Sequence, residues 1–125
     1  MARRVLIVDD AIFMRTAVRR ILDGAGFEVV GEAENGEVAV RKYCELMPDV
    51  VVMDITMPVM DGISAAKHIL QSDPAAKIVM CTALGQQNLV VEALQAGAKD
   101  YIVKPFQADR VVEGITKALV AGGAG

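Results

Sequence analysis

Short, uninterrupted runs of aliphatic residues recur along this sequence, and each is followed by a segment with helical spacing. A run without polar alternation is typical of a strand that is buried on both faces, as the strands of parallel sheets are. The buried runs are Val5–Val8, Val50–Met53, Ile78–Cys81 and the shorter Tyr101–Val103, while the more polar Glu28–Ala33 is typical of an edge strand. Strands that alternate with helices predict an α/β fold, in which helices cover both faces of a parallel sheet.

Five helical segments are expected between and after these strands. The first carries an apolar stripe with the spacing i, i+4, i+7 and i+8, formed by Met14, Val18, Ile21 and Leu22. The other four helices are expected over residues 38–47, 63–73, 89–96 and 111–119. Because no linker or change of composition divides the chain, we expect one domain over residues 1–120 and a frayed tail of small residues at 121–125.

Composition and charge exclude several classes of protein. Hydrophobic residues make up 54% of the 125 residues but aromatic residues only 4%, so the core must be aliphatic. The formal net charge of −3 argues against a nucleic-acid binder, which would carry a basic face. The first apolar run stops at Asp9, short of a signal peptide, and no run reaches the length of a membrane span. We therefore expect a cytoplasmic protein without membrane insertion, whose two cysteines are free thiols, buried or half-buried.

Charged and hydroxyl side chains stand where the predicted strands end. The first strand is expected to end in Asp9-Asp10, the third in Asp54, the fourth in Thr82-Ala83 and the fifth in Lys104-Pro105. The carboxyl ends of parallel strands share one edge of the sheet, where ligands bind, so we expect these side chains to gather there. Clustered carboxylates repel one another unless a cation neutralises them, and Mg²⁺ prefers oxygen ligands. The sequence therefore predicts a Mg²⁺ site at which a phosphate can approach the third-strand aspartate.

Each of these residues, taken alone, also has an ordinary interpretation. Asp10 could cap the first helix, because aspartate is a preferred N-cap residue. Lys104 alone would be a solvated loop residue, and Thr82 alone an ordinary threonine at a strand end. Their joint occurrence at the ends of four strands is more specific than any one of them.

Around these residues the chain resembles the receiver domains of response regulators, over about residues 4–120. The resemblance rests on the segments Val8-Asp9-Asp10, 53–62 (MDITMPVMDG), Thr82-Ala83, 96–101 (AGAKDY) and 104–106 (KPF). It implies a single doubly wound, flavodoxin-like (βα)5 domain with a five-stranded parallel sheet in the order 2-1-3-4-5. It also implies a cis peptide bond between Lys104 and Pro105.

The resemblance implies a role for each acidic residue. Asp54 would be the nucleophile that accepts a phosphoryl group from a phosphohistidine of a partner histidine kinase. Asp10, Asp54 and the backbone carbonyl of Thr56 would ligate Mg²⁺, and Asp9 would assist directly or through water. The protein would catalyse only its own phosphorylation and dephosphorylation, so it is not expected to be an enzyme acting on other substrates.

The resemblance also implies a switch. Lys104 would pair with the aspartyl phosphate, and Thr82 would move to hydrogen-bond a phosphoryl oxygen. Tyr101 would then fill the volume that Thr82 leaves, unless it is only an aromatic residue at the sheet edge. Phosphorylation would thus bias the surface formed by the fourth helix, the fifth strand and the fifth helix towards binding another protein.

Two segments, 85–87 (GQQ) and 106–110 (FQADR), resemble the stand-alone chemotaxis regulators of this family. This implies the flagellar motor switch protein as target, and a phosphatase as a further partner. A phosphorelay carrier, or a receiver domain cut from a longer regulator, remains open as an alternative. The adjacent apolar residues Ile12 and Phe13, beside the acidic site, suggest partner docking or local packing.

Two remote alternatives are disfavoured by single positions. A dehalogenase-type phosphatase needs a second aspartate where Thr56 stands, because threonine cannot act as general acid at neutral pH. A flavin-binding module of this fold would carry serine, threonine and glycine after the first strand, whereas Asp9 and Asp10 would repel the flavin phosphate.

Overall fold

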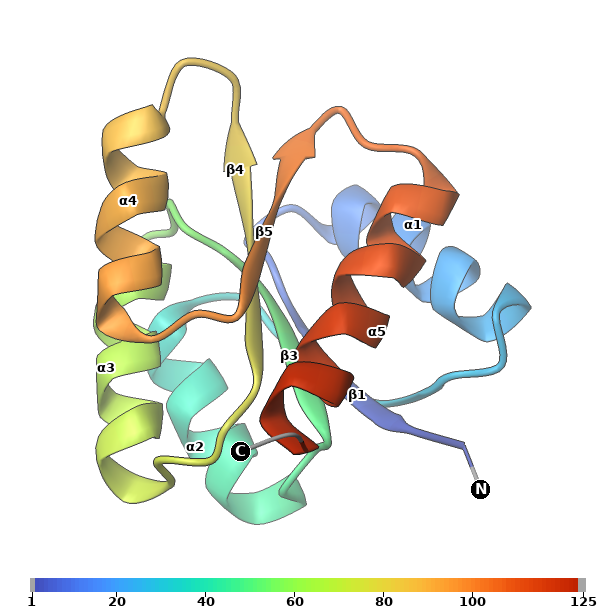
Figure 1. The fold of residues 1–125 in the computed structure, drawn as a ribbon, viewed down its shortest axis with the longest axis horizontal. Helices are drawn as coiled ribbons and strands as arrows, with labels where there is room; N and C mark the ends of the chain where they lie inside the picture. Colours follow the sequence, from blue (N-terminus) through green and yellow to red (C-terminus); the bar gives the residue numbers. More distant parts are fainter. Residues whose placement is uncertain (1, 124–125) are drawn as a thin grey trace.

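A five-stranded parallel sheet forms the centre of the molecule (Figure 1). The structure, a computed structural model, describes residues 2–123. The strands lie in the order β2-β1-β3-β4-β5, so the predicted fold class and strand order are confirmed. Their bounds are β1 Arg4–Val8, β2 Glu28–Ala33, β3 Val50–Asp54, β4 Ile78–Ala83 and β5 Asp100–Lys104.

Helices cover both faces of the sheet, as Figure 1 shows. One face is covered by α1 (Ile12–Gly24) and α5 (Ala108–Gly123). The opposite face is covered by α2 (Gly36–Leu46), α3 (Gly62–Ser72) and α4 (Gln87–Ala96). Helices α1 to α4 each return the chain to the next parallel strand, which is the connection that parallel pairing requires, and α5 follows the last strand.

Alternate residues of each strand divide the core between the two faces. In β1, Leu6 and Val8 pack towards α2, α3 and α4, whereas Val5 and Ile7 pack towards α1 and α5. These four side chains are at most 2% exposed. The uninterrupted aliphatic runs therefore supply apolar side chains to both layers of the core. Full burial of one such side chain stabilises the fold by about 1.5–3 kcal/mol.

Local signals set the helix ends. The Asn35 side chain accepts a hydrogen bond from the Val38 N–H, so α2 begins two residues before the predicted start. Met47 then takes a left-handed conformation, with φ 47°, directly before Pro48. At the start of α3 the Asp61 carboxylate accepts a hydrogen bond from the Ser64 N–H at 2.8 Å.

The structure excludes one alternative interpretation, the capping of α1 by Asp10, and corrects one expectation, the burial of Cys44. Helix α1 is preceded by Ala11 at the N-cap position without a side-chain cap hydrogen bond, so Asp10 does not cap this helix. Cys44 is exposed, although the other cysteine, Cys81, is buried as expected, and both are free thiols. The described residues contain no helix with the length and apolar composition needed to cross a membrane.

The domain boundary expected at residue 120 falls inside α5, because this helix continues to Gly123. Residues 124 and 125 of the expected tail lie outside the described residues. The frayed tail therefore stays a prediction.

Candidate functional site

Asp54 is the last residue of β3, and the backbone of Gly62, at the start of α3, packs against the Asp54–Ile55 backbone. Its side chain reaches the carboxyl edge of the sheet, and the residue is only 9% exposed. The loop after β3 folds back, and the Gly62 N–H donates to the Ile55 carbonyl at 2.7 Å. Gly62 lies so close that an added Cβ would be 2.2 Å from the Asp54 carbonyl oxygen. Glycine is therefore required here for the close approach of two backbone segments.

Three carboxylates gather at this edge of the sheet. Asp9, Asp10 and Asp54 each place one oxygen within 4.8 Å of the others. Asp9 is buried, and its Oδ1 accepts a hydrogen bond from the Ala11 N–H at 2.9 Å. Asp10 is exposed at the mouth of the cluster. The parallel topology thus brings together the acids that follow two neighbouring strands.

Lys104, at the end of β5, joins this cluster. Its Nζ lies 2.8 Å from Asp9 Oδ2 and 3.3 Å from Asp54 Oδ2. The peptide bond from Lys104 to Pro105 is cis, as the resemblance to receiver domains implies. The lysine therefore links the two buried carboxylates from the far edge of the sheet.

The proximity of these groups changes their proton affinities. Burial raises the pKa of Asp54; the charge of Lys104 opposes this rise and the charge of Asp9 adds to it. For Lys104, burial favours the neutral amine, but the hydrogen bond to Asp9 and the charges of both carboxylates outweigh it and raise its pKa. The lysine thus stays an ammonium, and this single positive charge neutralises the three clustered carboxylates only in part.

Arg15 is a second cationic side chain that contacts Asp9, and no sequence pattern predicted this contact. The Arg15 Nη1 donates to the Asp9 backbone carbonyl at 2.5 Å, and its Nε donates to Glu32 Oε1 at 2.9 Å. Arg19 pairs with the other oxygen of Glu32 at 2.7 Å. Arg15 stands next to Met14, within the segment that carries the apolar stripe of α1, and a charged residue there ordinarily indicates only the solvated face of the helix.

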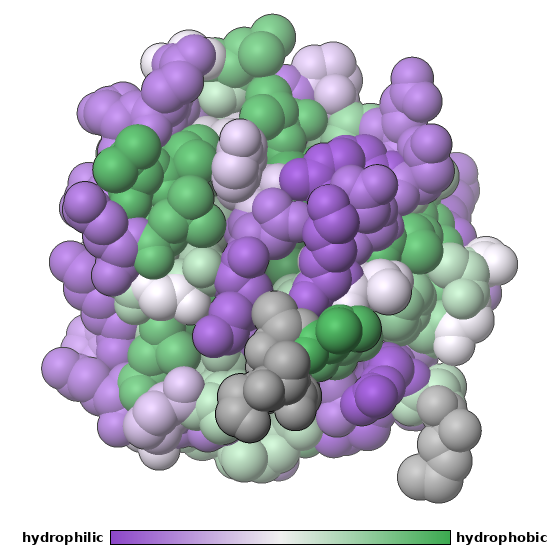
Figure 2. Space-filling model, in the orientation of Figure 1, coloured by the Kyte–Doolittle hydropathy of each residue, from purple (hydrophilic) through white to green (hydrophobic). Residues whose placement is uncertain are grey.

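Thr82 and Tyr101 lie on the neighbouring strands β4 and β5. Thr82 is buried, 1% exposed, near the end of β4, and Tyr101 on β5 is 37% exposed. Both side chains line one groove between β5 and α4. Figure 2 shows hydrophobic side chains gathered at the upper left of the view, in the region of α4. Val91 and Leu94 of α4 are exposed and line the same groove. The structure therefore places the two expected switch residues at a partly apolar surface.

The remaining sequence-predicted residues, and one that the sequence did not indicate, are exposed in the segments that follow β1 and β3. Thr56 is exposed, two residues after Asp54, and the metal-ligand role of its carbonyl stays a prediction. Ile12 and Phe13 begin α1, and each is 70% exposed, so local packing does not account for them. Val59 is 76% exposed and takes a positive φ of 68°, which the sequence did not indicate.

Residues 5–116 match the family described as the response regulator receiver domain. The chain is 65% identical to the chemotaxis protein CheY of Bacillus subtilis over 119 residues, which cover 95% of this chain and 99% of that protein. It is 62% identical to the chemotaxis protein CheY of Thermotoga maritima over 117 residues, which cover 94% and 98% respectively.

Among solved structures, the chain is similar to the CheX-CheY-BeF3-Mg+2 complex from Borrelia burgdorferi. The TM-score is 0.87 at 40% identity, and the match covers 91% of this chain and 87% of that one. Since both the sequence and the fold match over most of its length, the chain belongs to the response regulator receiver domains and is a CheY-like receiver of a two-component system.

Proposed function

We propose that this chain is a chemotaxis switch that accepts a phosphoryl group from a histidine kinase on Asp54 and then binds a protein target. The observation that carries the proposal is the position of Asp54. Its carboxylate lies within 4.8 Å of oxygens from Asp9 and Asp10 and 3.3 Å from the Lys104 ammonium. High identity to CheY proteins over nearly their full length supports the assignment to chemotaxis.

The donor set fits Mg²⁺. Three carboxylates and one ammonium leave a formal charge of −2, which a divalent cation would neutralise. Asp10 and Asp54 would ligate the ion together with the Thr56 carbonyl. Asp9 would assist directly or through water. Its two oxygens already accept hydrogen bonds from the Ala11 N–H and from the Lys104 ammonium. The bound ion would reduce the repulsion between these carboxylates and an incoming phosphoryl group.

The chain's own residues would act on the phosphoryl group as follows. An Oδ of Asp54 forms a bond to phosphorus while the phosphorus–nitrogen bond of the donor's phosphohistidine breaks and the released imidazole takes up a proton. Lys104, already 3.3 Å from this carboxylate, would pair with the transferred group. The Thr82 hydroxyl would donate a hydrogen bond to a phosphoryl oxygen. The protein would catalyse only its own phosphorylation and dephosphorylation, and it is not proposed to turn over another substrate.

The phosphorylated protein would act in the cytoplasm by binding a flagellar motor switch protein through α4, β5 and α5. The half-exposed Tyr101 and the apolar surface over α4 support this face as the output surface. Ile12 and Phe13 would dock the kinase or a phosphatase, because they are exposed beside the acidic cluster. A phosphorelay carrier, or a receiver that is part of a longer regulator, would use the same acceptor with a different output.

The proposal is tested by phosphorylating the protein with a small phosphodonor in the presence of Mg²⁺ and locating the acyl phosphate by mass. Asp54→Asn should incorporate no phosphate and stay folded, and a chelator should stop incorporation in the wild type. Full labelling of Asp54→Asn would contradict the assignment.

A second measurement separates the motor switch from the relay. Affinity for a motor-switch peptide is measured with and without phosphorylation, beside back-transfer to a histidine phosphotransfer domain. Rapid back-transfer without phosphorylation-dependent affinity would favour the relay carrier.

A further inference from the structure

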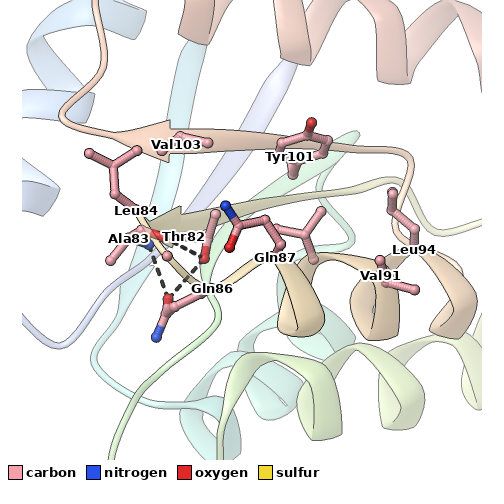
Figure 3. A pocket seen from close by; sticks show the side chains of 11 residues that line it. Thr82, Ala83, Leu84, Gln86, Gln87, Val91, Leu94, Tyr101 and Val103 are labelled. Carbon is pink, nitrogen blue, oxygen red and sulfur yellow. Dashed lines mark hydrogen bonds between the residues drawn. The ribbon is translucent and has the colours of Figure 1, made fainter.

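Gln86, which precedes α4, makes a side-chain contact that none of the proposed phosphoryl chemistry uses. It lies at one end of the groove of about 440 Å³ that also contains Thr82 and Tyr101. In Figure 3 its side-chain oxygen points at the end of β4, where two dashed hydrogen bonds meet it. Oε1 accepts from Thr82 Oγ1 at 2.9 Å and from the Ala83 N–H at 3.1 Å.

The chemistry of these groups fixes the direction of both hydrogen bonds. A backbone N–H can only donate, so the Gln86 atom that faces Ala83 must be the amide oxygen and not the amide nitrogen. That oxygen has no proton, and therefore the Thr82 hydroxyl must be the donor in the second bond. The alternative acceptor, the Ala83 carbonyl, is farther from the hydroxyl at 3.4 Å. The single hydroxyl proton of Thr82 is thus directed to Gln86.

We propose that Gln86 is a positioning residue that holds Thr82 away from the phosphoryl site and sets how readily the switch is made. This inference rests on the proposed function, in which the Thr82 hydroxyl donates to a phosphoryl oxygen. One hydroxyl carries one proton, so it cannot donate fully to Gln86 and to a phosphoryl oxygen at once. The two arrangements compete, and Gln86 stabilises the unphosphorylated one.

Burial makes this competition effective. Thr82 is 1% exposed, so water cannot readily replace Gln86 as the hydroxyl's partner. Ala83 is exposed, so its N–H can bond to water if Gln86 is removed. Loss of the Gln86 oxygen therefore destabilises mainly the arrangement in which the Thr82 hydroxyl donates to Gln86. A net hydrogen bond of ordinary strength corresponds to a change of roughly 2- to 13-fold in the balance between the two arrangements.

The test compares Gln86→Met, which keeps the length of the side chain without the acceptor, with the wild type. Beryllium fluoride with Mg²⁺ serves as the phosphoryl mimic, and NMR signals of Thr82 and Tyr101 report binding and the state of the free protein. Gln86→Met should bind the mimic about 2- to 13-fold more tightly. Its free Thr82 and Tyr101 signals should shift towards their positions in the bound wild type.

Three further variants separate this role from a general effect on α4. Gln86→Glu keeps an acceptor oxygen and should not show the increase. Gln87→Met changes the next side chain, which lines the same groove but makes no hydrogen bond to Thr82 among the described residues, and should match the wild type. In a Thr82→Val background, Gln86→Met should have no effect on affinity, because the hydroxyl that it releases is absent.

The outcomes distinguish this inference from the proposed function. If the wild type itself does not bind beryllium fluoride at Asp54, the phosphoryl-acceptor assignment fails. If the wild type binds it and Gln86→Met binds it with equal affinity, the assignment stands and the role of Gln86 is refuted. An equal increase in the Thr82→Val background would also refute it, because the effect would then not pass through the hydroxyl.

Discussion

The backbone beneath Asp54 tolerates no side chain at Gly62, and Gly62→Ala should therefore damage both stability and the acceptor site. The new Cβ would lie 2.2 Å from the Asp54 carbonyl oxygen and 3.0 Å from the Ile55 Cα. The first distance is about 1.2 Å short of the 3.4 Å at which ordinary van der Waals contact begins. Both neighbours are backbone atoms, so no side chain can rotate away, and α3 or the end of β3 must move.

The magnitude follows from this geometry. Overpacking of a core costs about 1–3 kcal/mol, and a backbone-on-backbone clash places Gly62→Ala at the upper end. For a domain of this size a loss of about 3 kcal/mol lowers Tm by roughly 10 °C. Since a displacement of about 1 Å at a reacting group can cost roughly 100-fold in rate, phosphorylation of Asp54 should slow by more than unfolding alone explains.

The assay is thermal unfolding followed by circular dichroism, together with the rate of phosphorylation measured well below the Tm of the variant. Gly24→Ala is the matched control, because nothing lies within 4 Å of its added Cβ at the end of α1. This control should be unchanged or stabilised by up to about 1 kcal/mol, since alanine is the better helix former. A Gly62→Ala protein with wild-type Tm and phosphorylation rate would refute the steric argument.

Three further predictions concern stability. Tyr43→Phe removes the hydrogen bond from the Tyr43 hydroxyl to Asp73 Oδ2 at 2.6 Å without creating a cavity, and it should cost about 1.5 kcal/mol in urea unfolding. Burial alone would raise the pKa of Glu32, but its two arginine partners outweigh this and lower it. The Glu32 contribution is therefore present above its ordinary pKa of 4.5 and is lost as pH falls through the lower folded value, so Glu32→Gln should lose less stability below pH 4.5 than the wild type. Addition of Mg²⁺ at about 100 times its Kd should stabilise the protein by about 2.7 kcal/mol, and Asp10→Ala should abolish most of this gain in a thermal-shift assay.

The strands were predictable because their aliphatic runs are unambiguous. The third strand was predicted to end in Asp54 and the fourth in Thr82-Ala83, and β3 and β4 end at Asp54 and Ala83. The first strand differs, because β1 ends at Val8 and not at the predicted Asp9-Asp10. A hydrophobic pattern does not record where backbone pairing to the neighbouring strand stops.

The gathering of the charged residues followed from topology alone, whereas the contacts of long side chains did not. Parallel strands bring Asp9 and Asp54 to one edge whatever the details of the loops. The contacts of Arg15 with the Asp9 carbonyl and of Gln86 with Thr82 depend on side-chain rotamers and on the path of one loop. Neither residue belongs to a pattern that predicts such a partner.

If Asp54 is the phosphoryl acceptor, as proposed, the arrangement of Lys104 lets the cluster be stable before phosphorylation and still respond to it. This lysine lies closer to Asp9, at 2.8 Å, than to Asp54, at 3.3 Å, so it mainly neutralises the carboxylate that is not the proposed acceptor. A divalent cation at the carboxylates would make that neutralisation unnecessary, and the ammonium would then be available to a phosphoryl group on Asp54. Thr82 is in a comparable position, since its proton is directed to Gln86 until a stronger acceptor forms. Both groups already have partners in the unphosphorylated protein, so the energy of switching is the difference between two sets of contacts.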